Sequence, residues 1–452
     1  MSDAEIDELL TRFHNALRME GPLDVNLPAD ASLYVEGLHG KRDAVSSLRR
    51  DIQRTEGGGV FLFIGQAGSG KRTELHRLQR DLRARGSKVY YVDLLEWLNV
   101  SEPVTLSSFL VSLLSGWVDQ IGTVVAQRTP AERLITFFSK TRLIPESIKL
   151  DAAAGPIKGQ IQFAMQSDAD FRRSLELNLR KQLSSIVSQA HAFVAELKTD
   201  LCPQGQKCVL LADSIEKMAG VGDGGQQVYE SVQQLFTSEG SALKLPGLHL
   251  VFSVSPYMLE QNKQLPTVLG TGGVVSMPSV HVFQRNSSLA DAQGVAAVVQ
   301  LVERRFPDWG QVFTVDQLQR LILDTGGDLR ELLRAIRVAI NEDIEALPVK
   351  DEVVSQALDS VRPPKAIPVE HVAWMARLQA THEPELSDKI DARVLQRYLS
   401  TKHVLAYLNG EAWYAVHPLL RDWVVSKAAR AAADTVAALG VAGPALGEPA
   451  RG

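Results

Sequence analysis

Residues 60–76 of the chain read VFLFIGQAGSGKRTELH, and the pattern of this stretch indicates the fold class. Its first five residues, 60–64, are a continuous run of Val, Phe, Leu and Ile, which is typical of a strand buried on both faces of a parallel sheet. A glycine-rich segment, residues 65–71, follows at once and leads into a stretch with the spacing of a helix. A second β-type run, residues 88–94, comes one helix later. Strand, glycine loop, helix and strand together predict a βαβ unit.

The glycine-rich segment GQAGSGK matches the pattern GxxxxGK, placed between a buried strand and a helix as that motif requires. Glycines let backbone N–H groups turn inward around a phosphate, Lys71 adds a point charge, and the helix N-terminus adds its partial positive charge. The alternative, a glycine-rich turn with an exposed lysine, is disfavoured by the two flanking elements. The residues that we expect to bind the nucleotide phosphates are Gly65, Gln66, Ala67, Gly68, Ser69, Gly70, Lys71, Arg72 and Thr73.

One position departs from this pattern. After the lysine the motif has Ser or Thr, whose hydroxyl holds Mg²⁺, but here Arg72 stands there and Thr73 comes only afterwards. An arginine cannot ligate a cation. Thr73 is rotated by about 100° around the helix, so it reaches the metal only if the turn shifts. We therefore expect nucleotide binding to tolerate this change better than hydrolysis does.

A second chemical motif follows the apolar run at residues 208–212. The run ends in Asp213, and Glu216 comes three residues later. Such a strand presents a carboxylate at its C-terminal end, where ligands bind in open parallel sheets. We expect Asp213 to hold Mg²⁺, directly or through water, and Glu216 to orient or deprotonate the attacking water. The alternative is a capping aspartate with a solvated glutamate.

A further apolar run, residues 248–253, completes the predicted sheet. Next to the Asp213 strand, it places Ser253 or Ser255 near the γ-phosphate as a polar sensor, unless these serines only end the strand. His249 lies inside the run, and we expect a core histidine with satisfied hydrogen bonds. The β-type runs together predict a doubly wound α/β domain with a parallel sheet.

These segments resemble the AAA+/STAND group of P-loop ATPases. The resemblance rests on GQAGSGKRT, CVLLADSIEK, LHLVFSVSP and the helical segment that follows, and it covers residues of about 35–345. In the STAND branch the acidic strand typically ends in Asp, two residues and a second acid, which is similar to Asp213 and Glu216. The resemblance implies ATP and Mg²⁺ as cofactors.

Two more segments are similar to that group. EGLHGKRDAVSSLRRDI resembles the Gly-Arg-Glu box that lies against the adenine, with Gly40, Lys41, Arg42 and Asp43 at that place in a less regular form. TGGDLRELLR resembles the sensor helix whose arginine reaches the phosphates, which is Arg330 here. The catalytic residues that the resemblance implies are Glu216, Lys71 and Arg330.

The remaining chain reads as helical modules and a hairpin. An Asn-Gly pair between two β-rich runs near residue 409 is a hairpin signal, and the helices before it suggest a winged helix. The predicted fold class is therefore α/β, a P-loop NTPase parallel sheet with a helical insertion, followed by an all-α lid domain and a winged-helix domain. The predicted boundaries are 1–34 for an N-terminal helical leader, 35–285 for the ATPase core with its insertion at about 104–200, 286–361 for the lid, 362–427 for the winged helix and 428–452 for a disordered tail.

The composition excludes several other classes. The 452 residues are 45% hydrophobic and 22% charged, as in a globular protein, and the net charge of −5 gives no global attraction to nucleic acid or anionic membranes. The two cysteines and scattered histidines form neither a disulfide scaffold nor a zinc site. The acidic start MSDAEIDELL is unlike a secretory signal, and no apolar run is long enough to span a bilayer. We expect a cytoplasmic protein.

Charges on the predicted winged helix balance, with seven basic and seven acidic residues between 366 and 427. Duplex binding normally needs a basic excess, although Arg393, Arg397 and Lys402 form a weak stripe. We therefore favour a protein partner or effector, with a nucleotide-dependent homo-oligomer as a second expectation, over nucleic acid.

The function that these observations predict is an ATP-dependent molecular switch with slow hydrolysis coupled to domain rearrangement and partner signalling. The resemblance implies a role in bacterial regulation or defence. The alternatives are a DNA-associated AAA+ loader or regulator that uses its winged helix, and a nucleotide-stabilised scaffold without turnover, which Arg72 makes credible.

Overall fold

The structure is a computed structural model. It describes residues 1–17, 21–40, 43–66, 68–99, 101–122, 130–141, 159–161, 169–218, 225–256, 258, 264–270, 273–277, 279–388, 390–408 and 411–438, with only the backbone described at 169–183, 204, 216, 225–226, 408 and 435–438. The chain forms two compact units. One is Glu20–Pro278, and the other combines Met1–Met19 with Ser279–Gly452.

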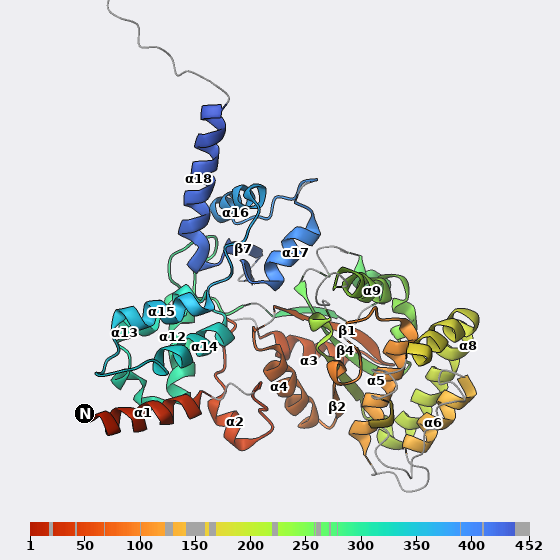
Figure 1. The fold of residues 1–452 in the computed structure, drawn as a ribbon. Helices are drawn as coiled ribbons and strands as arrows, with labels where there is room; N and C mark the ends of the chain where they lie inside the picture. The colour runs from red at the N-terminus through yellow and green to blue at the C-terminus, as the bar shows by residue number, and fades with distance from the viewer. Residues whose placement is uncertain are drawn as a thin grey trace, which may run out of the picture. The chain divides into compact units, whose positions relative to one another are not determined.

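A five-stranded parallel sheet forms the centre of the first unit (Figure 1). Its strands lie in the order β2-β3-β4-β1-β5. The sequence predicts four of them, whereas the short strand after residue 272 was not expected. The strand bounds are β1 Gly59–Gly65, β2 Lys88–Asp93, β3 Cys208–Asp213, β4 Leu248–Val254 and β5 Gly273–Met277.

The apolar runs form strands because helices cover both faces of the sheet. Val60, Leu62 and Ile64 of β1 belong to the hydrophobic cluster on one face, and Phe61 and Phe63 to the cluster on the other, as the two-residue period of a strand requires. Both sides of β1 are therefore buried, which explains its uninterrupted apolar sequence.

The helices of the first unit divide between these two clusters. Side chains of α3 and α4 pack on one face, and those of α5, α8 and α9 on the other. The predicted helical insertion corresponds to α5, α6 and α8. The helix bounds are α2 Pro28–Leu33, α3 Ala44–Arg54, α4 Lys71–Arg83, α5 Leu106–Ile121, α6 Pro130–Thr141, α8 Ala169–Leu201, α9 Gly225–Ser238 and α11 Leu265–Leu269.

His249 in β4 is a core histidine, as predicted. It is buried, with Nε2 3.0 Å from the carbonyl oxygen of Thr55 and Nδ1 3.4 Å from that of Cys208. Burial lowers the pKa of His249, so the neutral imidazole is favoured.

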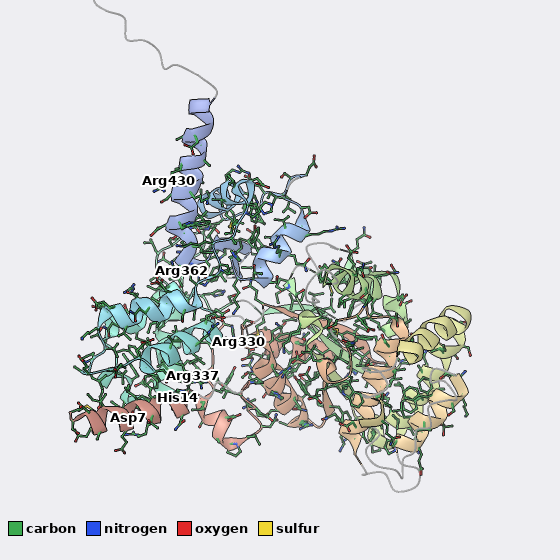
Figure 2. The ribbon with its side chains drawn as sticks, viewed as in Figure 1. Asp7, His14, Arg330, Arg337, Arg362 and Arg430 are labelled. Atoms are coloured by element: carbon green, nitrogen blue, oxygen red, sulfur yellow. The ribbon has the colours of Figure 1, made fainter. Side chains whose placement is uncertain are left out.

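The second unit begins with an all-helical part. The sequence assigns residues 1–34 to one leader, but helix α1 belongs to this unit, where Phe13 stacks on Phe306 at 4.3 Å between ring centroids. The side chain of Arg337 also donates a hydrogen bond to His14, 2.8 Å away, and Figure 2 labels both residues. The helix bounds are α1 Asp3–Ala16, α12 Ala292–Arg305, α13 Val315–Asp324, α14 Leu329–Ile340 and α15 Asp351–Val361.

The rest of this unit has the predicted winged-helix arrangement. Helices α16 (Val369–Thr381) and α17 (Ala392–Ser400) precede an antiparallel hairpin of β6 (Val404–Leu408) and β7 (Ala412–Val416). The Asn-Gly turn expected at residues 409–410 lies outside the described residues. Trp374, Tyr398, Tyr414 and other apolar side chains form the core of this module.

Helix α18 (Arg421–Ala438) continues well beyond residue 427, after which the sequence predicts a disordered tail. Its alanine-rich composition explains the difference, because alanine has the highest intrinsic helix propensity. Residues 439–452 lie outside the described part of the chain.

Among the helices in the described residues, none combines the length and the apolar character that crossing a bilayer would need.

Candidate functional site

The glycine loop between β1 and α4 turns through backbone conformations that glycine favours. Gly68 and Gly70 have φ values of 86° and 89°, a left-handed conformation that favours glycine. At Gly65, an added Cβ would lie 2.9 Å from Lys71 Cγ and 3.0 Å from the carbonyl oxygen of Met277. The glycines that the sequence places here are therefore required by backbone conformation and close packing. Ala67, another residue predicted to bind phosphate, lies outside the described residues.

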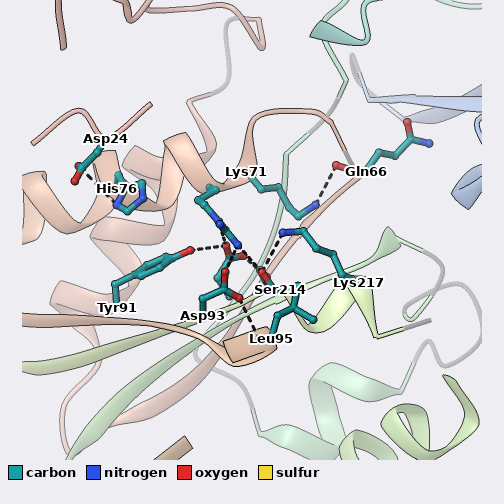
Figure 3. A network of polar contacts seen from close by, with 12 residues as sticks. Asp24, Gln66, Lys71, His76, Tyr91, Asp93, Leu95, Ser214 and Lys217 are labelled. Carbon is teal, nitrogen blue, oxygen red and sulfur yellow. Dashed lines mark hydrogen bonds and ion pairs between the residues drawn. The ribbon is translucent and has the colours of Figure 1, made fainter. Parts of the chain in front are cut away.

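Lys71 is the first residue of α4, and its ammonium group turns back to the loop (Figure 3). Its Nζ donates to the carbonyl oxygens of Gly65 at 2.7 Å and Gln66 at 3.0 Å. Gly70 is the N-cap residue of the helix and has no side chain to cap it. A helix N-terminus without a side-chain cap, the helix dipole and a buried ammonium group together suit an anion.

The first unit has a P-loop NTPase fold. A glycine loop of the required conformation follows β1, and parallel β4 lies between this loop strand and the acidic strand β3. No protein-family model matches the chain, and no curated protein matches it.

Solved structures of archaeal proteins are similar over most of the chain. The ORC2 protein of Aeropyrum pernix, in its ADPNP–ADP complexes, has 13% sequence identity and a TM-score of 0.40, with 89% of this chain and 99% of that chain covered. Its ADP form has 14% identity and a TM-score of 0.40, covering 87% and 94% of the two chains. Cdc6p from Pyrobaculum aerophilum has 9% identity and a TM-score of 0.35, covering 90% and 98%.

Arg72 points to the carboxyl ends of β2 and β3. Its Nε donates to Asp213 Oδ2 at 2.8 Å, and its Nη2 donates to Ser214 Oγ at 2.7 Å and to an oxygen of Asp93. Asp93 and Asp213 are register partners on adjacent parallel strands. The arginine therefore bridges two carboxylates that the sheet holds side by side.

Asp213 is almost fully buried, and both of its carboxylate oxygens accept hydrogen bonds. Ser253 Oγ donates to Oδ1 at 2.6 Å, and Tyr91 OH donates to Oδ2 at 2.6 Å beside the Arg72 bond. Burial raises the pKa of Asp213, but the bonds from Ser253, Tyr91 and Arg72 outweigh it and lower the pKa to about 2. Asp213 is therefore a stable buried carboxylate.

Ser214, the next residue, completes the cluster from a strained backbone. Its φ of 73° is uncommon for a residue with a side chain and costs about 1–3 kcal/mol. Its N–H donates to Ser253 Oγ at 2.9 Å, and its own hydroxyl accepts from Lys217 Nζ at 3.1 Å as well as from Arg72. Ser253, predicted as a γ-phosphate sensor, thus orients Asp213 and the following turn.

The residues that precede α3 are attached to α4 by a second polar cluster. Tyr34 OH donates to Glu74 Oε1 at 2.8 Å, and Arg77 Nε lies 3.0 Å from Glu74 Oε2. Arg77 also pairs with Asp43, which caps α3 by accepting from the backbone N–H of Ser46 at 3.1 Å. This cluster fixes the chain on both sides of the box that the sequence compares with an adenine-binding motif.

Within that box, Gly40 has a left-handed φ of 90°, whereas Lys41 and Arg42 lie outside the described residues. His39 stands beside the phosphate loop, because a Cβ added at Gly70 would lie 3.9 Å from His39 Nε2. His39, the residue before Gly40, therefore lies near the loop, and the adenine contact of the box stays a prediction.

Three other predicted site residues lie on the first turns of α4 and α14 and in a short 3-10 helix. Thr73 lies on the first turn of α4 and is partly exposed. The backbone at Glu216 is part of the short 3-10 helix Ile215–Lys217, but its side chain is not described. Arg330 is exposed on the first turn of α14 in the second unit (Figure 2). Their proposed roles stay predictions.

Magnesium is the cation that the resemblance implies, and the acidic cluster does not fit it. Both oxygens of Asp213 already accept hydrogen bonds, and a guanidinium lies between Asp213 and Asp93 where a cation would have to sit. Among the residues that the structure describes, no group of three or more His, Cys, Asp or Glu side chains is arranged to hold a metal ion.

Sequence reasoning missed Asp93, Tyr91 and Lys217 as members of this cluster. A signal existed for Asp93, since it ends a β-type run, as Asp213 does, and carboxyl ends of parallel strands meet at one edge. Tyr91 carries no such signal. Tyr91 lies two residues before Asp93, which is the register partner of Asp213. Only this pairing of the strands brings the Tyr91 hydroxyl to the Asp213 carboxylate.

Proposed function

We propose that this protein is an AAA+-type nucleotide-dependent switch that binds ATP and ADP at the phosphate loop. The observation that carries the proposal is the conformation of residues 65–71: left-handed Gly68 and Gly70, an uncapped helix N-terminus, and the buried Lys71 ammonium group held at the loop. A polyphosphate suits this arrangement, since it accepts several N–H bonds and balances the ammonium charge.

Calorimetric titration with ATP and ADP tests this proposal. Lys71→Ala should weaken binding about tenfold or more, because a charge-assisted bond to phosphate contributes about 1.5–3 kcal/mol. Lys88→Ala is the matched control. Lys88 is exposed at the N-terminal end of β2, at the opposite edge of the sheet, and its loss should leave affinity unchanged. Equal affinities for the wild type and Lys71→Ala would place the nucleotide elsewhere.

The second unit supplies a physical route for a switch. The turn before α14 is clamped by the winged-helix hairpin: Tyr407 OH donates to the carbonyl oxygen of Gly326 at 2.6 Å. Lys402 Nζ lies 2.7 Å from Asp328 Oδ2 and 2.9 Å from Glu331 Oε1. These groups are largely buried, so a displacement of α14 is transmitted to the hairpin.

The finer parts of this function are part of the same proposal. If Arg330 on α14 responds to the γ-phosphate, the winged helix moves with it and presents a different surface to a protein partner or to a second copy of the chain. Glu216→Gln should then slow phosphate release more than it weakens ATP binding, since a water-positioning carboxylate acts in the transition state. The STAND subtype and a role in defence stay predictions.

A DNA-associated regulator is the second candidate, and one observation favours it. Arg393 and Arg397 are both exposed on α17, one turn apart, ahead of the hairpin. The third member of the predicted stripe, Lys402, is instead committed to Asp328 and Glu331. Two exposed arginines are a small footprint for phosphate binding.

Duplex binding separates the two candidates. Fluorescence anisotropy with labelled duplex DNA, repeated at rising salt, measures how many phosphates the protein neutralises. A steep salt dependence that is reduced in Arg397→Ala would favour the DNA-associated role. No binding at low salt would leave the protein-partner switch.

A further inference from the structure

Arg72 supplies a positive charge between two carboxylates at the carboxyl ends of β2 and β3. Asp93 and Asp213 are register partners at the carboxyl ends of β2 and β3, and their side chains are only 14% and 2% exposed. Two ionised carboxylates on neighbouring strands repel each other strongly in a poorly solvated site unless a positive charge lies between them. In many phosphate-binding sites a divalent metal has that role, but here the Arg72 guanidinium occupies the position.

Arginine suits this position for reasons of geometry and charge. Its planar group presents several N–H donors in a fixed fork, so one side chain can reach both carboxylates, whereas an ammonium group is a point charge. The Arg72 pKa is raised by Tyr91, Asp213 and Asp93 in spite of partial burial, which keeps the group charged. Lys217, through its bond to Ser214, brings a further positive charge close by.

Three side chains around Asp213 hold this arginine in place. Tyr91 and Ser253 orient Asp213, and Ser214 accepts an Arg72 bond from a strained backbone. If Arg72 swung away, Asp213 and Asp93 would be left together without a positive charge, so such a movement is costly. A metal ion would have to displace this whole arrangement to bind there.

We propose that Arg72 is the resident cation of the nucleotide site and that ATP and ADP bind without a divalent metal. This inference rests on the proposed function, because it concerns the same loop. Arg72 follows Lys71 directly in the first turn of α4, so both positive charges are supplied by the chain. The site therefore takes the metal-free nucleotide as its ligand.

Titration calorimetry in excess EDTA and in excess magnesium chloride tests this inference. Wild-type protein should bind ATP and ADP in EDTA at least as tightly as with magnesium, to within about twofold. Arg72→Thr restores the hydroxyl of the usual motif and removes the guanidinium from between Asp93 and Asp213. Its affinity should become at least about tenfold tighter with magnesium than in EDTA, because Mg²⁺ now finds oxygen ligands. Circular dichroism checks that this variant is folded.

A second measurement needs no variant. Wild-type protein saturated with ADP and Mn²⁺, then desalted, should retain nucleotide with far less than one Mn²⁺ per ADP by electron paramagnetic resonance. Stoichiometric Mn²⁺, or wild-type binding about tenfold tighter with magnesium, would overturn the metal-free site while leaving nucleotide binding established. If the wild type binds neither nucleotide under either condition, the proposed function fails first and this inference falls with it.

Discussion

Replacing Arg72 by methionine should destabilise the sheet edge and reverse its response to acid. Methionine keeps much of the aliphatic volume but removes the guanidinium that lies between Asp93 and Asp213. Removing one partner of a fully buried ion pair costs about 3–5 kcal/mol. Because the Arg72 side chain is 25% exposed, solvent screens part of this cost, and we expect a loss of about 2–3 kcal/mol at neutral pH.

The pH dependence follows from the pKa of Asp213. In the wild type this pKa is lowered from 3.8 to about 2, which stabilises the folded state by about 2 kcal/mol. A lowered carboxyl pKa contributes fully above the unfolded value, so the contribution is constant from neutral pH to about 4. It is lost as the pH falls from about 4 to about 2, where the folded carboxylate takes up its proton.

In Arg72→Met the change of stability with pH has the opposite sign. Burial still raises the pKa of Asp213, and Asp93 lies beside it without the guanidinium, so only the bonds from Ser253 and Tyr91 remain to lower it. We expect burial and the repulsion from Asp93 to outweigh these two bonds, which places the folded pKa above the unfolded one. The folded state then binds more protons than the unfolded chain, and stability rises as the pH falls from 7 towards 4. The variant should thus recover part of its loss in mild acid, where the wild type gains nothing from Asp213.

Hydrogen exchange followed by mass spectrometry measures this effect at the right place, because peptides covering β3 report the opening free energy of the strand itself. Arg72→Lys is the matched control, since it keeps the charge without the fork and should lose less stability than the methionine variant. If Arg72→Met exchanges like the wild type at pH 7, or is destabilised further at pH 5, the ion-pair interpretation of the cluster is refuted.

Two more predictions concern packing and the second unit. Lys402→Met leaves Asp328 and Glu331 without their shared positive charge. Thermal unfolding of the second unit should therefore show a free energy of unfolding that is about 1–3 kcal/mol lower. An unchanged melting temperature would contradict the proposed clamp. Gly116→Ala would push a Cβ into a methyl group of Val92. Chemical denaturation should therefore show a free energy of unfolding that is about 1–3 kcal/mol lower. An unchanged free energy of unfolding would mean that α5 can shift to make room.

Most of the sheet could be predicted from local pattern. The β1, β3 and β4 segments are continuous apolar runs because helices cover both faces, and that burial leaves a direct trace in the sequence. Strand β5 left a weaker trace. Of its five residues only Val275 and Met277 are buried, in the pattern expected of an edge strand, so the segment GVVSM does not stand out.

The hydrogen-bond partners of the Arg72 side chain could not be predicted from local pattern. The sequence shows that Arg72 cannot ligate a metal, but its partners Asp93 and Asp213 are 21 and 141 residues away along the chain. Only the pairing of β2 with β3 brings those two carboxylates together. A local departure from a motif thus identified the position, while the long-range register determined its role.

The phosphate cradle and the cation site differ in what they are made of, and this explains why one could be predicted and the other could not. The cradle is formed mainly by backbone N–H groups, whose placement depends on left-handed Gly68 and Gly70 and on the start of α4. Such features are encoded by glycines at fixed spacing, so they survive changes in neighbouring side chains. The proposed cation site is formed by side chains from three separate strands and a helix, and in our proposal the residue next to Lys71 supplies the positive charge that a metal ion supplies elsewhere. A loop of this kind can therefore keep its ligand while changing the chemistry beside it, and the metal dependence of binding, more than binding itself, is the property that Arg72 should control.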